Sequence, residues 1–487
     1  MHTVLATLRS PRRLTTEILA GLVTALALIP EVVSFAVIAG VDPKVALYTS
    51  CIMAITIAFV GGRPAMVSAA AGATALVIAP LVASHGLDYL IAAVWLAGAL
   101  QIVLAVTGVA RLMRFIPRSV MIGFVNALAI LIFSAQLGHL FDVPWLVYPL
   151  VAFGIAMVVF IPKLTTAVPA ALIAIVVLTG VVVLFGVDVP DVADQGELPG
   201  GFPTWMIPDV PFTVETLGII APYAVGLALV GLMESLMTAK LVDDLTDTHS
   251  DKTREAWGQG VANGAAALFG GMGGCAMIGQ TMINVKEGRA RTRISTFLAG
   301  VFLLVLCVTV GDVVGAIPMA ALVAVMIVIA VTTFDWRSIT PRTLKLMPIS
   351  ETLVMLVTVI GTLATDNLAI GVVAGVLTAM VAFARRVAHM TRVHATDDAD
   401  GVRTYTVSGE LFWASSNDLV YQFDYAGDPE HVVIDLTDAE VWDASTVATF
   451  DSVLHKYSEK GKTAQIVGLD GASLRRVEML SGKLGDS

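Results

Sequence analysis

The chain has 487 residues, of which 57% are hydrophobic and only 14% charged, and its mean hydropathy is +0.84. Soluble domains contain about 45–50% apolar and about 25% charged residues, so this composition excludes a simple soluble enzyme. The net charge of −10 lies mostly in residues 387–487, which hold 8 basic and 17 acidic side chains. Nucleic acid binding needs clustered Lys and Arg, so we expect no nucleic acid partner.

The body of the chain, residues 1–386, is a series of apolar stretches separated by charges and by Gly or Pro clusters. A bilayer core about 30 Å thick needs about 20 apolar helical residues, so each stretch is a candidate membrane segment. The first stretch ends at Pro30-Glu31 without a small-residue cleavage site, so we expect it to be retained. The pattern predicts about fourteen segments, at 18–39, 44–60, 65–84, 88–108, 115–138, 144–161, 165–186, 214–240, 254–270, 273–285, 294–311, 316–334, 347–363 and 367–386.

The basic residues of the body indicate the orientation of these segments. If Arg9, Arg12 and Arg13 are cytoplasmic, 20 of the 21 Lys and Arg residues of the body fall on the cytoplasmic side, and only Lys44 falls outside. This asymmetry is what the positive-inside rule predicts for an even number of spans. We therefore expect both termini in the cytoplasm.

The longest polar connection, residues 187–213, contains no Lys or Arg and separates seven segments from seven. An odd number of spans in each half makes the second half enter the membrane from the opposite face, as in the inverted repeats of secondary transporters. We expect repeats at about 15–187 and 213–386. The segment 273–285 is too short to span alone, and a broken helix at membrane depth points to a site.

Beyond Arg386 the pattern is that of a soluble α/β domain, which we place at residues 390–487. Thr404-Tyr405-Thr406-Val407 alternates, and His431 to Leu436 is typical of a buried strand. Residues 445–460 have helical spacing, and Ala464 to Gly468 predicts another strand. A strand, helix and strand in succession predict a small sheet covered by helices.

Two carboxylates lie well inside the predicted segments, Glu31 after Pro30 and Glu234 in the segment 214–240. A charge at bilayer depth costs roughly 3 kcal/mol or more, so each is a candidate functional group. Either residue can exchange a proton, or hold a cation together with neighbouring oxygens such as those of Ser235 and Thr238. Glu31 has an alternative role, capping or lining a solvated gap at a helix broken by Pro30. The three cysteines, Cys51, Cys275 and Cys307, have no metal or redox spacing and are interpreted as small core residues.

Two openings rich in Gly and Ala precede short helices: residues 68–74 and residues 270–281. Small side chains let backbone N–H groups face a ligand, and a helix N-terminus carries about +0.5 charge. Two such ends meeting at the membrane midplane make an anion site without a basic side chain. The alternative is that the small residues only allow close helix packing.

These pieces, taken in order, resemble the SulP family of anion transporters, which includes sulfate and bicarbonate permeases. In the second half the resemblance lies in Glu234-Ser235-Leu236, Val242 to Thr246, Gly258 to Asn263, Gly270-Gly271-Met272 and Asn284-Val285. In the first half it lies in Ala20-Gly21-Leu22, Ile29-Pro30, Gly40, Pro43, Leu47-Tyr48, Phe115-Ile116-Pro117 and Gly123-Phe124. It covers essentially the whole chain, because the C-terminal domain is similar to the STAS modules of this family.

The resemblance implies an all-α polytopic membrane protein with 14 segments in 7+7 inverted repeats, a core domain that moves against a gate domain, and a small cytoplasmic STAS-like α/β domain. It implies no enzymatic activity. It places an anion between the N-termini of the third and tenth helices and a coupling ion, sodium or a proton, at the eighth. The implied substrate-binding residues are Ala71, Gly72, Ala73, Thr74, Ala276, Met277, Ile278 and Gln280. The implied coupling residues are Glu234, Ser235 and Thr238, with sodium at Glu234 and Thr238.

Two departures from the family pattern concern the substrate. Many relatives have an Arg where this chain has Gln280, and many have a Pro where it has Gly273-Gly274. A buried divalent anion needs a fixed opposite charge, so the loss of a cation favours a monovalent anion such as bicarbonate, or an anion carried with sodium or a proton.

In the STAS-like domain, Ser445 occupies the place of a serine that is phosphorylated in single-domain STAS regulators. A phosphate at a helix N-terminus is electrostatically favourable, so Ser445 is a candidate switch. The simpler interpretation is that Asp443 or Ser445 caps the following helix.

We therefore expect a secondary active transporter of small anions, of the bicarbonate or sulfate class, in the bacterial inner membrane. Family analogy implies a homodimer that contacts the lipid bilayer and needs no cofactor beyond a sodium ion or proton. The alternatives are an uncoupled anion channel, a nucleobase or dicarboxylate permease of the same fold, and a membrane-tethered sensor.

Overall fold

The computed structural model describes residues 4–108, 116–164, 169–309, 311–365, 367–389, 391–397, 401–416 and 419–481. The chain forms two compact units, residues 1–376 and 377–487. In the described part of the chain, seven helices have the length and apolar composition to cross a membrane, and four further apolar helices have 10–17 residues.

The first half of the membrane unit contains the helices predicted from hydropathy. Pro11 and Pro43 stand in the first turns of α2 and α3, where proline is best tolerated, and Gly40 ends α2 in the left-handed conformation. Gly86 (φ +79°) interrupts α4 between the predicted segments 65–84 and 88–108. The elements are α1 (Val4–Leu8), α2 (Pro11–Ala39), α3 (Pro43–Val60), β1 (Ser68–Ala69), α4 (Gly72–Val106), α5 (Arg118–Leu137), η2 (Gly138–Leu140), α6 (Val147–Leu164), α7 (Ala170–Phe185) and η3 (Ala193–Gln195).

The second half starts at Thr213, whose hydroxyl caps α8 by accepting from the Thr216 N–H. Asp251 caps α9 in the same way through the Arg254 N–H. The elements are α8 (Val214–Thr246), α9 (Lys252–Ala267), β2 (Cys275–Ala276), α10 (Ile278–Met282), the π-helical turn η4 (Ile283–Glu287), α11 (Arg293–Thr309), α12 (Gly311–Gly315), α13 (Met319–Thr333), η5 (Trp336–Ile339), α14 (Pro341–Leu346), α15 (Ile349–Thr365) and α16 (Leu368–Ala388).

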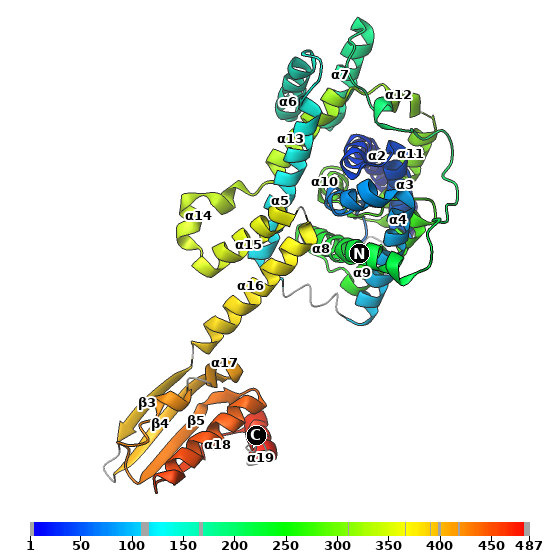
Figure 1. The fold of residues 1–487 in the computed structure, drawn as a ribbon. Coiled ribbons are helices and arrows are strands. Elements are labelled where there is room, and N and C mark those ends of the chain that lie inside the picture. Colours follow the sequence, from blue (N-terminus) through cyan, green and yellow to red (C-terminus); the bar gives the residue numbers. More distant parts are fainter. Residues whose placement is uncertain are drawn as a thin grey trace. The chain divides into compact units, whose positions relative to one another are not determined.

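The helices of the membrane unit pack as two bundles (Figure 1). The first bundle consists of α2, α3, α4, α8, α9 and α11, and the second of α5, α6, α7, α13 and α15. Each bundle therefore combines helices from both halves of the chain. The polar connection 187–213 links them: the Met319 N–H of α13 donates to the Pro190 carbonyl, and the Met206 N–H of the connection donates to the Leu268 carbonyl after α9. Lys44 forms an ion pair with Glu197 of this connection, which agrees with their predicted location on one side of the membrane.

Two of the predicted segments need correction at their starts. Residues 65–71 are not helical, because β1 and an extended Ala71 precede α4 at Gly72. The predicted segment 273–285 begins with the strand β2 and contains only the five residues of α10 before its π-helical turn. Residues 67–69 and 275–277 are not helical because their backbone groups hydrogen-bond to each other rather than within a helix.

The C-terminal unit contains the predicted sheet. The strand order is β3 (Arg392–Asp397), β4 (Val402–Leu411), β5 (His431–Val441) and β6 (Thr463–Val467), antiparallel for the first pair and parallel for the other two. The helices are α17 (Trp413–Ser416), η6 (Leu419–Gln422), α18 (Ala444–Glu459) and α19 (Gly471–Leu480). Val447, Phe450, Val453 and Tyr457 of α18 are buried in one core with alternate residues of β4 and β5.

The predicted fold class is confirmed: a helical membrane unit is followed by a small α/β domain. Phe115, residues 165–168 of the predicted segment 165–186, residue 310 of 294–311, and residues 390, 398–400, 417–418 and 482–487 of the predicted C-terminal domain lie outside the described residues.

Candidate functional site

The two small-residue openings meet in an antiparallel strand pair. Ser68 pairs with Ala276 and Ala69 with Cys275, and the Met277 N–H donates to the Val67 carbonyl at 2.9 Å. A side chain at Gly274 would place its Cβ 2.0 Å from the Ala69 carbonyl oxygen, so only glycine allows this approach. The pairing brings the starts of α4 and α10 to one region of the first bundle.

The N-terminus of α4 is left without a side-chain cap. Ala71 is the N-cap residue and has no side chain that can accept a hydrogen bond. The Thr74 hydroxyl donates to the Ala71 carbonyl at 2.8 Å, so this predicted binding residue orients the first turn. The ring of Phe35 packs against Gly72. A Cβ added at Gly72 would lie only 2.8 Å from Phe35 Cε1, so a larger residue would clash with the ring. The early N–H groups of a helix that lacks a cap are available to an anion.

The start of α10 carries the second opening. Met277 is its N-cap residue, again without a side-chain hydrogen bond, and Ile278 begins the helix. Gln280 is fully buried, and neither its amide nitrogen nor its amide oxygen has a hydrogen-bond partner in the described structure. The Glu31 carboxylate of α2 lies beside this amide. Glu31 and Phe35 are four residues apart on α2, so one face of α2 meets both openings.

Glu234 lies on α8 next to β2, with 8% of its surface exposed. The Cys275 thiol donates a hydrogen bond of 3.0 Å to Glu234 Oε2, and no other described side chain hydrogen-bonds to this carboxylate. Ser235 Oγ accepts from the Ala276 N–H at 3.0 Å. The Thr238 hydroxyl donates to the Glu234 carbonyl at 2.8 Å and lies 3.5 Å from the Ala276 carbonyl oxygen. All three predicted coupling residues therefore surround β2.

The interpretation of the cysteines as core residues missed one contact. All three cysteines are buried, but Cys275 is also the only described hydrogen-bond donor to the side-chain carboxylate of Glu234. Its position in the Gly273-Gly274-Cys275-Ala276 opening is the signal that places it at the site.

Side chains of α9, which the prediction left unassigned, hold both openings. The Asn263 amide accepts from the Gly274 N–H (2.8 Å) and donates to the Gly274 carbonyl (3.1 Å) and to Gln101 Oε1 (3.0 Å). Gln259 donates to Ser68 Oγ at 2.7 Å and to Glu255 Oε1 at 2.7 Å. Asn263 thus fixes the second opening and Gln259 the first.

Glu255 of α9 is another buried carboxylate of the first bundle. Its Oε2 accepts from the backbone N–H groups of Gly62 (2.8 Å) and Arg63 (3.0 Å). The Arg63 guanidinium pairs with Asp243 at 2.8 Å, and Lys252 pairs with the same carboxylate at 2.7 Å. Burial lowers the pKa of Arg63, and the Asp243 carboxylate opposes this effect. This network lies outside the residues predicted for the site.

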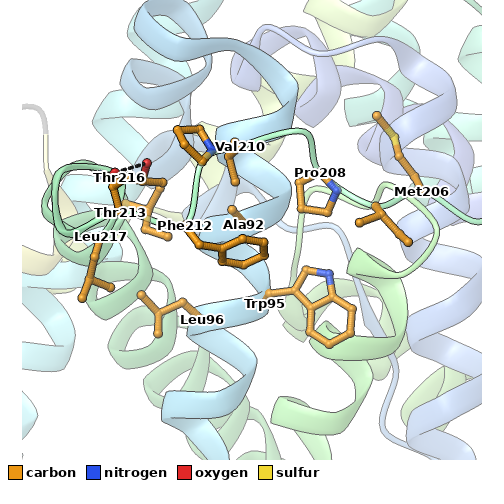
Figure 2. Close-up of a pocket in the computed structure, with 13 residues that line it drawn as sticks. Ala92, Trp95, Leu96, Met206, Pro208, Val210, Phe212, Thr213, Thr216 and Leu217 are labelled. Carbon is orange, nitrogen blue, oxygen red and sulfur yellow. Dashed lines mark hydrogen bonds between the residues drawn. The ribbon is translucent and has the colours of Figure 1, made fainter.

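A separate cavity of about 640 Å³ opens where α4, α8 and the connection 206–213 meet (Figure 2). Trp95, Leu96 and Phe212 line it, with the Phe212 ring between the other two in this view, and the Thr213 and Thr216 hydroxyls, 3.1 Å apart, hydrogen-bond at its edge. It contains no charged side chain and none of the predicted binding residues. A hydrated anion has no partner there, so we do not assign the substrate to it.

The last two predictions concern the sodium site at Glu234 and the candidate phosphorylation site Ser445. Among the described residues no group of three His, Cys, Asp or Glu side chains is placed to hold a metal ion. The Thr238 hydroxyl lies 2.8 Å from the Glu234 backbone carbonyl and 3.5 Å from the Ala276 carbonyl oxygen, one helical turn from the Glu234 side chain. In the C-terminal unit Asp443 caps α18 by accepting from the Thr446 N–H, and Ser445 is exposed in its first turn.

Comparison with known proteins gives the family. Residues 14–147 and 144–358 match the sulfate permease family, and residues 395–482 match the STAS domain. The putative sulfate transporter YbaR of Bacillus subtilis is 51% identical over 94% of this chain and 95% of its own length. The bicarbonate transporter BicA of Picosynechococcus is 25% identical over 96% of this chain and 91% of its own length.

Two solved structures share the fold. The transmembrane domain of a cyanobacterial bicarbonate transporter BicA aligns with a TM-score of 0.65 at 23% identity and covers 76% of this chain and 98% of that domain. Murine Slc26a9, an anion transporter in the inward-facing state, aligns with a TM-score of 0.81 at 16% identity and covers 96% of this chain and 87% of its own. The chain therefore belongs to the sulfate permease family, and is a multi-pass membrane protein of a bacterial family of anion transporters, not an enzyme, with a C-terminal STAS domain.

Proposed function

We propose that this protein is a secondary active transporter of a small anion of the bicarbonate or sulfate class, coupled to sodium or protons. The first bundle acts as the core and the second as the gate, and their relative movement gives alternating access. The observation that carries this proposal is the meeting of two uncapped helix starts across the β1–β2 pair beside a buried carboxylate. The relatives named as a putative sulfate transporter and a bicarbonate transporter support the substrate class.

The anion binds to the backbone N–H groups at residues 72–74 and 278–280, with the Gln280 amide as a side-chain donor. Among the described residues the Gln280 amide makes no hydrogen bond of ordinary geometry, although the Glu31 carboxylate lies beside it. A buried amide that lacks a well-formed hydrogen bond costs about 1–3 kcal/mol unless a ligand satisfies it. No basic side chain belongs to either opening, so the site has no full positive charge. This favours a monovalent anion, or an anion that enters with a cation.

Glu234 carries the coupling ion. A proton binds to its carboxylate, or sodium binds between that carboxylate, the Thr238 hydroxyl and the Ala276 carbonyl. The Ala276 carbonyl and N–H belong to β2, which pairs with the first opening. A cation at Glu234 therefore lies next to the backbone that holds the anion and offsets its charge. Glu31 contributes a second negative group to the pathway beside Gln280.

The arrangement in the cell follows from the same proposal. The protein lies in the bacterial inner membrane with both termini in the cytoplasm, and two copies form a dimer. Ser445 is exposed at the start of α18, where phosphorylation adds charge beside the Asp443 cap. The STAS domain thereby offers a site for regulation.

Uptake of labelled bicarbonate and of labelled sulfate into proteoliposomes, under imposed sodium or proton gradients, tests the proposal. We expect the native protein to accumulate one of these anions against its gradient, and Glu234→Gln to abolish accumulation. Glu215→Gln is the matched control, because Glu215 is an exposed acid in the first turn of the same helix. It should transport like the native protein.

The alternatives predict other results. Anion currents without accumulation indicate an uncoupled channel. Accumulation of a nucleobase or a dicarboxylate, but of neither inorganic anion, indicates a permease of the same fold with another substrate. The absence of both currents and accumulation from correctly inserted protein contradicts transport and favours a membrane-tethered sensor.

A further inference from the structure

A basic segment connects α13 and α15. Residues 336–349 contain η5 and α14, and they carry Arg337, Arg342 and Lys345 but no Asp or Glu. All three basic residues are exposed. In the ranges that the structure describes, none of their side chains takes part in a hydrogen bond or an ion pair. Among the described residues, the three cations of this segment therefore have no ion-pair partner, although Asp335 and Glu351 flank the segment.

The same segment exposes large apolar side chains. Trp336 is 56% exposed, Leu346 76% and Ile349 88%, and Ile339 and Leu344 are also exposed. The Trp336 indole N–H donates to the Val331 carbonyl at 2.8 Å, so its polar edge is satisfied within the protein. Exposed large apolar side chains do not stabilise a connection that faces water. Cations beside aromatic and aliphatic side chains are typical of a segment that lies in the membrane interface.

Both ends of the segment run into apolar helices. Helix α13 ends at Thr333, and α15 begins at Ile349, so the segment stays next to the bilayer in which these helices lie. Asn126 of α5 anchors the start of the segment. The Asn126 amide donates to Ser338 Oγ (2.9 Å) and accepts from the Asp335 N–H (2.8 Å). Asn126 and Ser338 are each 2% exposed. What binds to the segment is therefore mechanically connected to α5 in the second bundle.

We propose that residues 336–349 form a binding surface for anionic phospholipids. Arg337, Arg342 and Lys345 contact the headgroup phosphates, and the exposed apolar side chains enter the boundary between headgroups and acyl chains. Charge complementarity and continuity with the membrane-embedded surface favour lipid as the partner. The acidic C-terminal unit is the competing partner, since residues 387–487 carry 17 acidic and 8 basic side chains. A protein partner does not account for Leu346 and Ile349 directly beside the start of α15.

Quenching by brominated lipids in nanodiscs tests the proposal on the full-length protein. The discs contain phosphatidylcholine with about a fifth of phosphatidylglycerol, and the bromine is on the acyl chains of one lipid or the other. The difference between native and Trp336→Phe fluorescence isolates the Trp336 signal. Each basic side chain near an anionic surface attracts lipid by roughly fivefold, so three should enrich the anionic lipid strongly. We expect quenching per brominated molecule to be at least about threefold stronger for phosphatidylglycerol.

The variants make the result specific. Arg337→Gln with Arg342→Gln and Lys345→Gln should bring the two quenching values to equality while its melting temperature stays near that of the native protein. Lys456→Gln with Lys460→Gln and Arg475→Gln removes the same charge from the C-terminal unit and should leave the preference unchanged. Equal quenching by both lipids in the native protein overturns the proposal, because the segment then has no headgroup selectivity. Absence of quenching by either lipid also overturns it, since protein then covers Trp336. Neither outcome depends on which anion is transported.

Discussion

Glu234 and Glu255 are both buried carboxylates of the first bundle, yet their surroundings differ. Glu255 is fully buried and accepts from two backbone N–H groups and from Gln259, which in turn holds Ser68 of the first opening. Among the described residues, the side-chain carboxylate of Glu234 accepts only from the Cys275 thiol, a weak donor. A buried charge supplied with donors is a structural group. A buried carboxylate with a single weak donor has room to take up a proton or a cation. The comparison therefore indicates a structural role for Glu255 and supports the proposal that Glu234 is the coupling residue.

Matched substitutions give the largest expected effect. Glu255→Gln replaces acceptor oxygens by an amide that cannot accept from Gly62, Arg63 and Gln259 together, and should destabilise the protein by about 2–4 kcal/mol. Glu234→Gln breaks one thiol hydrogen bond and should change stability by less than about 1 kcal/mol. Thermal unfolding of the two purified variants in the same detergent measures this. If the two variants melt in the opposite order, the assignment of roles is wrong.

Gln259→Leu should have the next largest effect. It removes the donor that joins Glu255 to Ser68 and leaves both acceptors without that bond, at a cost of about 1–3 kcal/mol. Because β1 loses its anchor, the anion concentration that gives half-maximal uptake should also rise. Gln136→Leu, a buried glutamine of the second bundle, is the comparison variant and should leave that concentration unchanged. Loss of stability with unchanged anion affinity would show that Gln259 does not position the opening.

Cys275 offers a smaller and more selective test. Cys275→Ala removes the donor that competes with a cation for Glu234, so the coupling cation should reach half-saturation at a concentration a few times lower. Cys275→Ser keeps a donor of nearly the same size and should stay close to the native value. Uptake titrated with sodium, or with proton gradients, distinguishes the two variants. Equal curves for alanine and serine would mean that the thiol has no part in coupling.

The smallest effect concerns Asp435 of β5, a carboxylate that resembles Glu255 in having local donors. The Thr437 hydroxyl (2.6 Å) and N–H (2.9 Å) donate to Asp435 Oδ1 and lower the pKa of this carboxyl. Because the pKa is lower in the folded than in the unfolded state, this contribution is present at neutral pH and is lost as the pH falls below about 4. Hydrogen exchange of β5 in the full-length protein should show weaker protection in acid. Asp435→Asn should remove that part of the pH dependence.

Hydropathy was enough to predict the membrane segments, because each apolar stretch of the right length becomes a helix wherever its backbone has no other partner. It predicts the break at Gly86 and a short segment at 273–285, within which the structure has a helix from Ile278. It did not predict that residues 65–71 are non-helical, since residues 67–69 pair with residues 275–277, more than 200 positions away. No local pattern carries that information.

The candidate site was predictable only where a residue type is costly in a membrane. Glu234 and Glu31 stood out because charge at depth needs a reason. Gln259 and Asn263 did not, because amides in a helix of mixed composition are ordinary until their partners are known. Cys275 lies in one of the two openings, but the sequence does not show that its thiol reaches Glu234. Their roles depend on contacts between α9, β1 and β2, which only the folded structure brings together.

The strand pair between the two openings also limits how the site can move. Ser68 with Ala276 and Ala69 with Cys275 join the starts of α4 and α10 through backbone hydrogen bonds. The separation of the two helix starts should therefore stay constant through the transport cycle. Under the proposed function, the anion would stay bound between two helix starts at a fixed separation while the first bundle moves. Its release would depend on water reaching this site and on the charge state of Glu234. Substitutions at the surface between the two bundles would then change the transport rate, and substitutions at the two helix starts would change the affinity for the anion.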